Sequence, residues 1–304
     1  MNERYEEVAE AHTQTFRWIY ERPELQFVDW LKAGKGIFWI TGKAGCGKTT
    51  LMKFLFEDPR TNASLPRDIE NISIASFFFH ERGENPLLKS QEGLFRAVMH
   101  SILSNYRQLI PVALPRRWEM MKQNVLSGGN HMRMPNWSMA ELKLGFKALV
   151  SQKFLRLRLC LLIDGLDEFS GQHQDIVDAL EDLLPLSDDS YVHVQLCLSS
   201  RPLVVFEKAY LQYPHIRVQD LSADDIKIYV TTNFKKISEL RDLLTKDPVT
   251  TKLIIDEILL KAEGVRPSPI GESLAVLAQF HLFDPCGIAL GHPTNAIIFR
   301  SSCG

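Results

Sequence analysis

The residues whose types and spacing could do chemistry are concentrated first between Gly42 and Thr50. This stretch fits the pattern G-x-x-x-x-G-K-[ST] of a phosphate-binding loop, with Gly42, Gly47, Lys48 and Thr49 in the fixed positions. Glycines allow backbone N–H groups to turn toward a phosphate, and they place no Cβ in its way. The pattern predicts that Lys48 reaches the β and γ phosphates of a nucleotide and that the Thr49 hydroxyl is a ligand of Mg²⁺. The residues expected to bind nucleotide are Gly42, Lys43, Ala44, Gly45, Cys46, Gly47, Lys48, Thr49 and Thr50.

The flanking residues supply the strand and the helix that such a loop needs. Ile37–Ile40 is a short apolar run before the loop, and Leu51, Phe54 and Leu55 recur at helical spacing after it. This context favours a phosphate-binding loop over the alternative, a glycine-rich turn with an incidental lysine.

A second group of chemical residues follows the apolar run Leu159–Ile163. A hydrophobic strand that ends in aspartate is the Walker B arrangement, so we expect Asp164 to hold Mg²⁺ directly or through water. Asp167 and Glu168 are candidate catalytic residues that orient or deprotonate a water. The alternative is that both are solvated loop acids that cap the next helix. The phosphate-binding loop favours the catalytic interpretation.

A third candidate is Arg201, which follows the apolar run Val192–Leu198. In a sheet of strand order 5-1-4-3-2 this strand lies between the loop strand and the Walker B strand. Its carboxyl end would then approach the γ-phosphate, where Arg201 would act as a catalytic sensor of the terminal phosphate. A surface arginine before Pro202 is the alternative.

The expected fold is α/β: a three-layer αβα sandwich of the P-loop NTPase type with flanking helices and a mainly parallel five-stranded sheet, in the order 5-1-4-3-2. The strands are expected at 37–40, 72–79, 159–163, 192–198 and 216–218. Amphipathic helices are predicted at 91–109 and from the S-x-x-E capping signal at Ser138, a turn at 58–62, and a loop around 127–130. The expected division is a helical lead-in (1–33), a nucleotide-binding core (34–220), a helical extension (221–265) and an irregular tail (266–304).

Composition excludes several function classes. The net charge of −2 gives no reason to expect nucleic acid or an anionic membrane as a partner. The charged N-terminus lacks the apolar core of a signal peptide, and no apolar run approaches the ~20 residues that span a bilayer, so a cytoplasmic location is expected. Five scattered cysteines without a C-x-x-C pair suggest neither a disulfide framework nor a zinc site, and Cys160 and Cys197 are expected in the core.

Taken together, the motifs resemble those of the fungal NACHT NTPases, members of the STAND class of P-loop NTPases and of NOD-like receptor type. The resemblance rests on the segments 15–18, 36–43, 51–55, 77–83, 163–169, 199–202 and 221–226, and it extends over about 5–265. It implies a signalling switch that binds ATP or GTP with Mg²⁺, hydrolyses it slowly and assembles with copies of itself or with other NACHT chains. In fungi such proteins are associated with non-self recognition, heterokaryon incompatibility and programmed cell death.

Two departures from the family pattern bear on this expectation. Cys46 stands where the family more often has serine, but only its backbone N–H is needed for phosphate, so binding should survive. After Val265 the chain reads Arg-Pro-Ser-Pro-Ile-Gly instead of the family's helix, so we expect a product truncated after the core with a tail that is not a family element. A P-loop kinase and a non-hydrolysing nucleotide-binding scaffold remain alternatives, and no signature chooses between ATP and GTP.

Overall fold

The computed structural model describes residues 5, 6, 8, 15–126, 134–184, 191–221, 249, 252 and 253. The predicted loop at 127–130 and the predicted tail at 266–304 lie outside these residues. The same holds for the predicted helices after Leu221, apart from three isolated positions, and for most of the chain before Thr15.

Five parallel strands form one sheet in the order β2-β3-β4-β1-β5. This is the predicted order 5-1-4-3-2 read from the other edge, so the predicted fold class is confirmed. The strands are β1 (Gly36–Thr41), β2 (Asn71–Phe78), β3 (Leu157–Asp164), β4 (Val192–Ser200) and β5 (His215–Arg217).

The three central strands, β3, β4 and β1, are buried on both faces, which explains their nearly continuous apolar runs. All eight residues of β3 are buried. Along β1, Ile37 and Trp39 belong to the core on one face of the sheet, whereas Phe38 and Ile40 belong to the core on the other. This alternation follows from the two-residue period of a strand and produces three layers.

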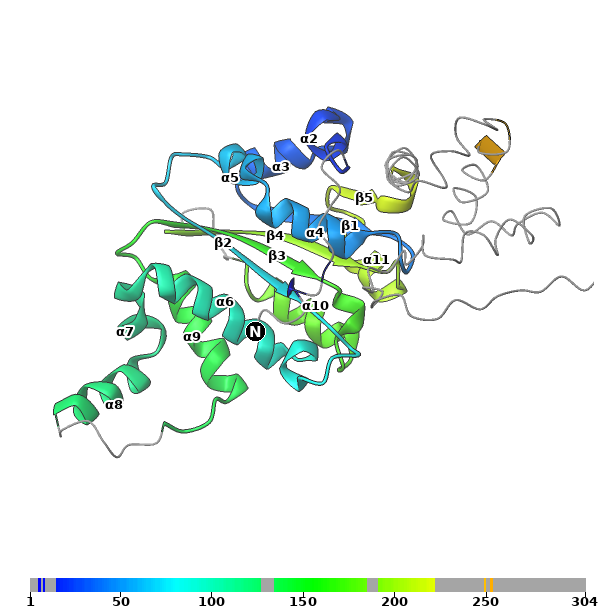
Figure 1. Ribbon diagram of the computed structural model, residues 1–304. Helices are drawn as coiled ribbons and strands as arrows, with labels where there is room; N and C mark the ends of the chain where they lie inside the picture. Colours follow the sequence, from blue (N-terminus) through cyan, green and yellow to red (C-terminus); the bar gives the residue numbers. More distant parts are fainter. Residues whose placement is uncertain are drawn as a thin grey trace, which may run out of the picture.

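One face of the sheet is covered by the helices near the phosphate-binding loop (Figure 1). They are α2 (Trp18–Glu21), η1 (Pro23–Leu25), α3 (Phe27–Ala33), α4 (Lys48–Glu57) and α5 (Pro59–Ser64). Helices therefore cover this face from Trp18 onward, and the short 3-10 helix that begins at Pro23 separates α2 from α3.

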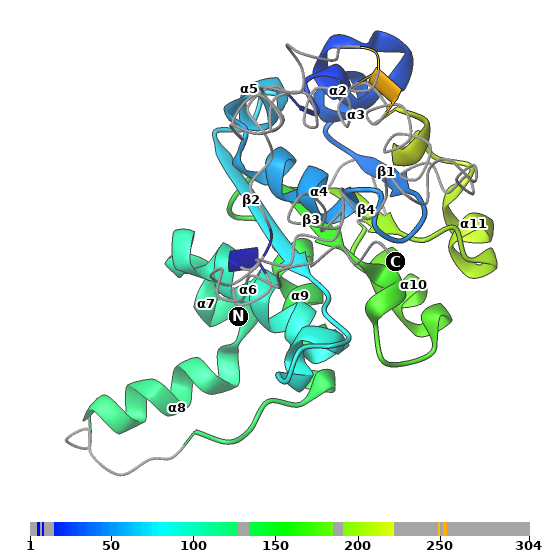
Figure 2. The same ribbon diagram turned by 45° about the vertical axis from the view of Figure 1, so that its right-hand side comes forward.

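The opposite face is covered by a second group of helices, and α8 extends away from it (Figure 2). The group consists of η2 (Pro86–Lys89), α6 (Gln91–Asn105), η3 (Arg107–Leu109), α7 (Ile110–Ala113), α8 (Pro115–Leu126), α9 (Met139–Ser151), η4 (Leu166–Glu168), α10 (His173–Glu181) and α11 (Val204–Tyr210). A last 3-10 helix, η5 (Val218–Asp220), follows β5. Among the described helices, none combines the length and the apolar character that crossing a bilayer requires.

Two local predictions need correction. The predicted turn at 58–62 is the start of α5, because the Asp58 side chain accepts a hydrogen bond from the backbone N–H of Arg60 and Pro59 occupies the first helical position. Asp-Pro is a helix-start signal as well as a turn signal. The predicted helix at 91–109 ends at Asn105 and is followed by η3.

Of the two hydrogen bonds that the capping signal before α9 predicts, one is formed. The Ser138 hydroxyl accepts a hydrogen bond of 3.2 Å from the N–H of Glu141, as predicted. The Glu141 carboxylate does not return to the cap, because it forms a two-pronged ion pair of 2.7 and 2.8 Å with the buried Arg117 of α8. Arg117 therefore fixes the first turn of α8 to α9.

The core also accounts for two of the cysteines. Cys160 and Cys197 are fully buried on neighbouring strands, as predicted. Because all five strands are parallel, their carboxyl ends lie at one edge of the sheet, where the three predicted chemical groups meet.

Candidate nucleotide-binding site

The phosphate-binding loop joins the end of β1 to the first residue of α4. Gly45 and Gly47 have positive φ angles of 75° and 91°, a backbone conformation that residues with a side chain rarely adopt. Gly47 is the N-cap of α4, so the helix N-terminus and its unpaired N–H groups open toward the loop. Lys43, Ala44 and Gly45 are exposed at the tip of the loop, whereas 46–50 are half-buried.

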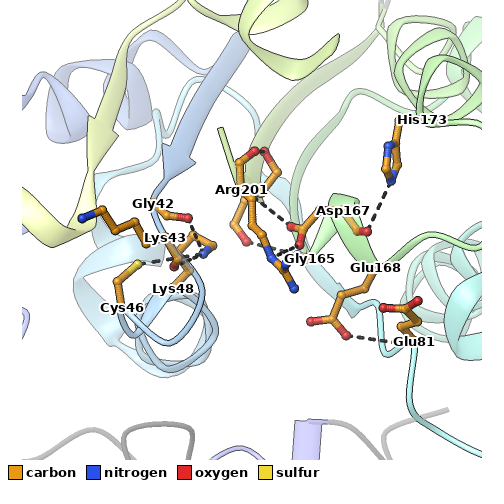
Figure 3. A network of polar contacts seen from close by, with 12 residues as sticks. Gly42, Lys43, Cys46, Lys48, Glu81, Gly165, Asp167, Glu168, His173 and Arg201 are labelled. Carbon is orange, nitrogen blue, oxygen red and sulfur yellow. Dashed lines mark hydrogen bonds and ion pairs between the residues drawn. The ribbon is translucent and has the colours of Figure 1, made fainter. Parts of the chain in front are cut away.

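The Lys48 ammonium lies within its own loop (Figure 3). Its Nζ donates hydrogen bonds of 2.8 Å to the carbonyl of Gly42 and 2.9 Å to the carbonyl of Lys43. The Cys46 sulfur is 3.9 Å away, and burial raises the pKa of the Cys46 thiol even though the Lys48 charge opposes this. Carbonyl oxygens are neutral partners, so an anionic phosphate oxygen would bind this ammonium more strongly.

Asp164 is the last residue of β3 and is 2% exposed. The Ser199 hydroxyl donates to Asp164 Oδ1 and accepts a 3.1 Å hydrogen bond from the N–H of Gly165, so one hydroxyl fixes both residues. Burial raises the pKa of Asp164 to about 6. Hydrogen bonds from Ser199 and Thr49 act in the opposite direction. The effect of Thr49 on this pKa shows that the two predicted metal ligands, Thr49 and Asp164, lie near each other.

This pair fits Mg²⁺. A hydroxyl and a carboxylate are hard oxygen donors, and Mg²⁺ is commonly held by one or two protein oxygens together with nucleotide phosphates and waters. Within the described part of the chain, no cluster of three or more His, Cys, Asp or Glu side chains has the arrangement of a metal site built from protein alone. Thr49 and Asp164 would therefore hold the ion jointly with phosphate.

Asp167 and Arg201 form an ion pair at the ends of β3 and β4 (Figure 3). Arg201 Nε lies 2.8 Å from Asp167 Oδ2, and the backbone N–H of Arg201 donates to Oδ1 at 2.9 Å. The Asp167 side chain is 7% exposed and the Arg201 side chain 50%. Both Asp167 oxygens are thus engaged by Arg201, an arrangement suited to positioning the arginine rather than to accepting a proton from water.

Glu168 lies at the loop that follows β2. Its Oε2 accepts a 3.0 Å hydrogen bond from the backbone N–H of Glu81. Lys89 bonds to the Glu81 carbonyl at 3.2 Å, and its own carbonyl accepts from the hydroxyl of Ser170 at 2.8 Å. Among the described residues, only Oε2 of Glu168 has a hydrogen-bond partner, so this carboxylate keeps the capacity to bind a water.

Sequence reasoning missed two residues that shape the site. Ser199 was interpreted only as part of a family segment. In the sheet, Ile163 pairs with Leu198, so the next residues of the two strands, Asp164 and Ser199, lie side by side. The predicted strand order could therefore have indicated this contact. Gln219 in η5 accepts a 3.3 Å hydrogen bond from the N–H of Lys43. No motif marks Gln219, because the contact depends on where the chain returns after β5.

Comparisons with known proteins identify a family whose model matches this chain. The family model described as nephrocystin 3, N-terminal, matches residues 14–201, which include the loop, Asp164 and Arg201. No curated protein matches the chain. Among solved structures, 56 chains match, including one in a structure of Drosophila ORC bound to DNA. It is 13% identical with a TM-score of 0.35, and the alignment covers 86% of this chain and 55% of that one, so this chain spans about half its length.

Proposed function

The chain belongs to the nephrocystin 3 N-terminal family, and from this premise we propose that it is a nucleotide-binding switch of the NACHT and STAND type. It binds ATP or GTP with Mg²⁺ and hydrolyses the triphosphate slowly. The observation that carries the proposal is that the phosphate-binding loop after β1 and Asp164 at the end of the Walker B strand lie at the same edge of the sheet, with Thr49 near enough to lower the pKa of Asp164.

Each site residue has a defined part in this proposal. Lys48 exchanges its two carbonyl partners for oxygens of the β and γ phosphates. Thr49 and Asp164 hold Mg²⁺, which when bound neutralises phosphate charge. Glu168 orients a water and accepts its proton as the water oxygen attacks the γ-phosphorus. The bond from that phosphorus to the bridging oxygen breaks, and the nucleoside diphosphate is the leaving group. Arg201, positioned by Asp167, donates to the terminal phosphate.

Identification of the bound nucleotide tests the proposal most directly. The full chain is purified gently in Mg²⁺ buffer, and the released small molecule is analysed by mass for its base and its phosphate count. We expect close to one adenine or guanine nucleotide per chain, and the base decides between ATP and GTP. Absence of nucleotide, together with no heat of binding for ATP or GTP with Mg²⁺, would contradict the proposal.

The domain division is part of the same proposal. The core spans 34–220, with a helical extension at 221–265 and a tail at 266–304 that does not belong to the nucleotide-binding unit. Deletion of 270–304 should therefore leave nucleotide affinity and thermal stability nearly unchanged. A large loss of folded protein would show that the tail belongs to the core.

The signalling role follows from the resemblance to fungal NACHT proteins. We place the protein in the cytoplasm and assign it to non-self recognition or cell-death signalling, with copies of itself or other NACHT chains as partners. Light scattering of the purified chain with ADP and with a non-hydrolysable ATP analogue, and with the guanine pair, tests the assembly. A triphosphate switch predicts larger particles with the triphosphate analogue of the bound base. The same mass with every nucleotide would contradict the switch.

A further inference from the structure

A surface cavity of about 380 Å³ lies on the helical layer that does not carry the phosphate-binding loop. It is bounded by α6, η3, α7, α9 and the segment before α9, and none of its lining residues belongs to the candidate nucleotide site. Its volume is at the lower end of the range of small-molecule sites.

The floor of the cavity is apolar. Met99 and Leu103 of α6 and Leu142 of α9 line it, and all three are buried. Trp137 forms part of the wall and is held in place by Arg117, whose guanidinium lies 3.5 Å from the ring centroid. Arg117 also forms an ion pair with Glu141, so the arginine that packs against the Trp137 ring is itself held in position.

The rim of the cavity carries nitrogen donors and no acid. Arg96, His100 and Arg107 line it, and the lining includes no Asp or Glu. Arg96 forms an ion pair with Glu92, with 3.2 Å between the guanidinium nitrogen and the carboxylate oxygen. Among the described residues, the side chains of Arg107 and His100 have no hydrogen-bond or ion-pair partner. An always-charged guanidinium beside an apolar floor complements a ligand with one anionic end and one apolar end.

We propose that this cavity binds a small amphiphilic carboxylate, an acid with a short aliphatic or aromatic body. The body fills the space against Met99 and Trp137, and the carboxylate accepts hydrogen bonds from Arg107 and His100. The inference does not depend on the proposed nucleotide function, because the two sites share no residue.

Calorimetry with three probes tests the charge and the apolar body separately. Octanoate carries both, 1-octanol lacks the charge and acetate lacks the body. We expect saturable binding of one octanoate per full-length chain with a Kd of about 1 mM or tighter, at least roughly tenfold tighter than 1-octanol, and no measurable binding of acetate. Equal affinity for octanoate and 1-octanol, binding of acetate as strong as octanoate, or no saturation would overturn the proposal.

Three variants localise the binding. Arg107→Gln should weaken octanoate roughly tenfold and leave 1-octanol unchanged. Ser104→Trp, at an exposed lining position of α6, should block both probes by filling the space. Arg116→Gln is the matched control, since Arg116 is an exposed arginine on α8 outside the cavity. Octanoate binding that survives both cavity variants would place the ligand elsewhere. A far-UV circular dichroism spectrum and an unfolding temperature equal to those of wild type show that each variant is folded.

Discussion

The candidate site has two halves that are stabilised in different ways. In the phosphate-loop half, 42–50, the Lys48 ammonium is held by carbonyls five and six positions earlier in the chain. In the acidic half, 164–168 with 199–201, the supporting contacts join residues far apart: Ser199 to Asp164 over 35 positions, Arg201 to Asp167 over 34, and Glu81 to Glu168 over 87.

This difference teaches what each half depends on. The phosphate-loop half depends on backbone conformation, which glycines supply locally, so a side-chain change there removes a ligand contact and leaves the rest in place. The acidic half depends on side chains that position one another across three strands. The effect of a substitution in this half should therefore increase with the number of residues that the replaced side chain contacts.

The largest effect should come from the phosphate-loop half. Lys48→Ala removes the ammonium that would contact the phosphates, and losing two or three charge-assisted hydrogen bonds costs on the order of 1,000-fold in triphosphate affinity. Calorimetry with ATP and GTP in Mg²⁺ measures it. Lys43→Ala is the control. Only the backbone of Lys43 is expected to contact phosphate, and its side chain extends away from Lys48 (Figure 3). Unchanged affinity in Lys48→Ala would remove the phosphate-loop assignment.

Next come the two acids of the acidic half, which should differ from each other. Glu168→Gln should lower hydrolysis at least about 100-fold, since an amide cannot accept the proton of water. Asp167→Asn should lower it roughly tenfold, because it acts through the position of Arg201.

Phosphate release under single-turnover conditions measures both effects. If Asp167 acts only through Arg201, the Asp167→Asn and Arg201→Ala effects will not add in the double variant. Equal losses in the two acid variants would show that Asp167 takes part in proton transfer. No difference between wild type, the variants and a protein-free background would leave a scaffold rather than an enzyme. Formation of the nucleoside diphosphate that requires an added acceptor, with the γ-phosphoryl group on that acceptor and no inorganic phosphate released, would indicate a kinase.

Ser199→Ala should have an intermediate effect that appears only with Mg²⁺. Without the hydroxyl, Asp164 and the N–H of Gly165 lose their shared partner, and the metal-dependent part of nucleotide affinity should fall roughly tenfold.

Ser200→Ala is the matched control for this experiment. Ser200 accepts from the indole N–H of Trp39 at 3.0 Å and does not contact Asp164. The Ser200→Ala substitution should therefore lower thermal stability without changing the Mg²⁺ dependence of nucleotide affinity. If the two serine variants have the same Mg²⁺ dependence, Ser199 is not a positioning residue for the metal.

The smallest effect is a pH dependence. With the pKa of Asp164 raised to about 6, the carboxylate is largely ionised at pH 7. The Mg²⁺-dependent gain in nucleotide affinity should therefore fall about twofold at pH 6 and about tenfold at pH 5. Asp164→Asn should abolish both the gain and its pH dependence. A gain that stays constant down to pH 5 would show that Asp164 does not bind the ion.

The same group affects stability without Mg²⁺, with a sign fixed by linkage. The pKa of Asp164 is higher in the folded than in the unfolded chain, so the protonated carboxyl stabilises the fold below about pH 4, and this contribution is lost as pH rises through about 6. The free energy of unfolding of wild type minus that of Asp164→Asn should decrease over this interval.

The contrast between the halves also explains what the sequence could predict. The five strands and their order follow from apolar runs and from the loop and Walker B motifs, because burial on both faces leaves a clear pattern. Lys48, Thr49 and Asp164 could be predicted as site residues because each has a fixed place within a short motif, the first two in the phosphate-binding loop and the third at the end of an apolar strand. The Asp167–Arg201 pair, the Ser199 bridge and the Gln219 contact were not, since they depend on side-chain orientation at strand ends.

The contact between Gln219 and Lys43 has a mechanical consequence. Gln219 follows β5, an edge strand that pairs with β1 over three positions only. A pulling force applied to the chain after Leu221 would therefore act on the weakest strand of the sheet and, through the 3.3 Å hydrogen bond to Lys43, on the tip of the phosphate-binding loop. Tension on this side of the molecule would reach the loop before it reached the core strands β3 and β4.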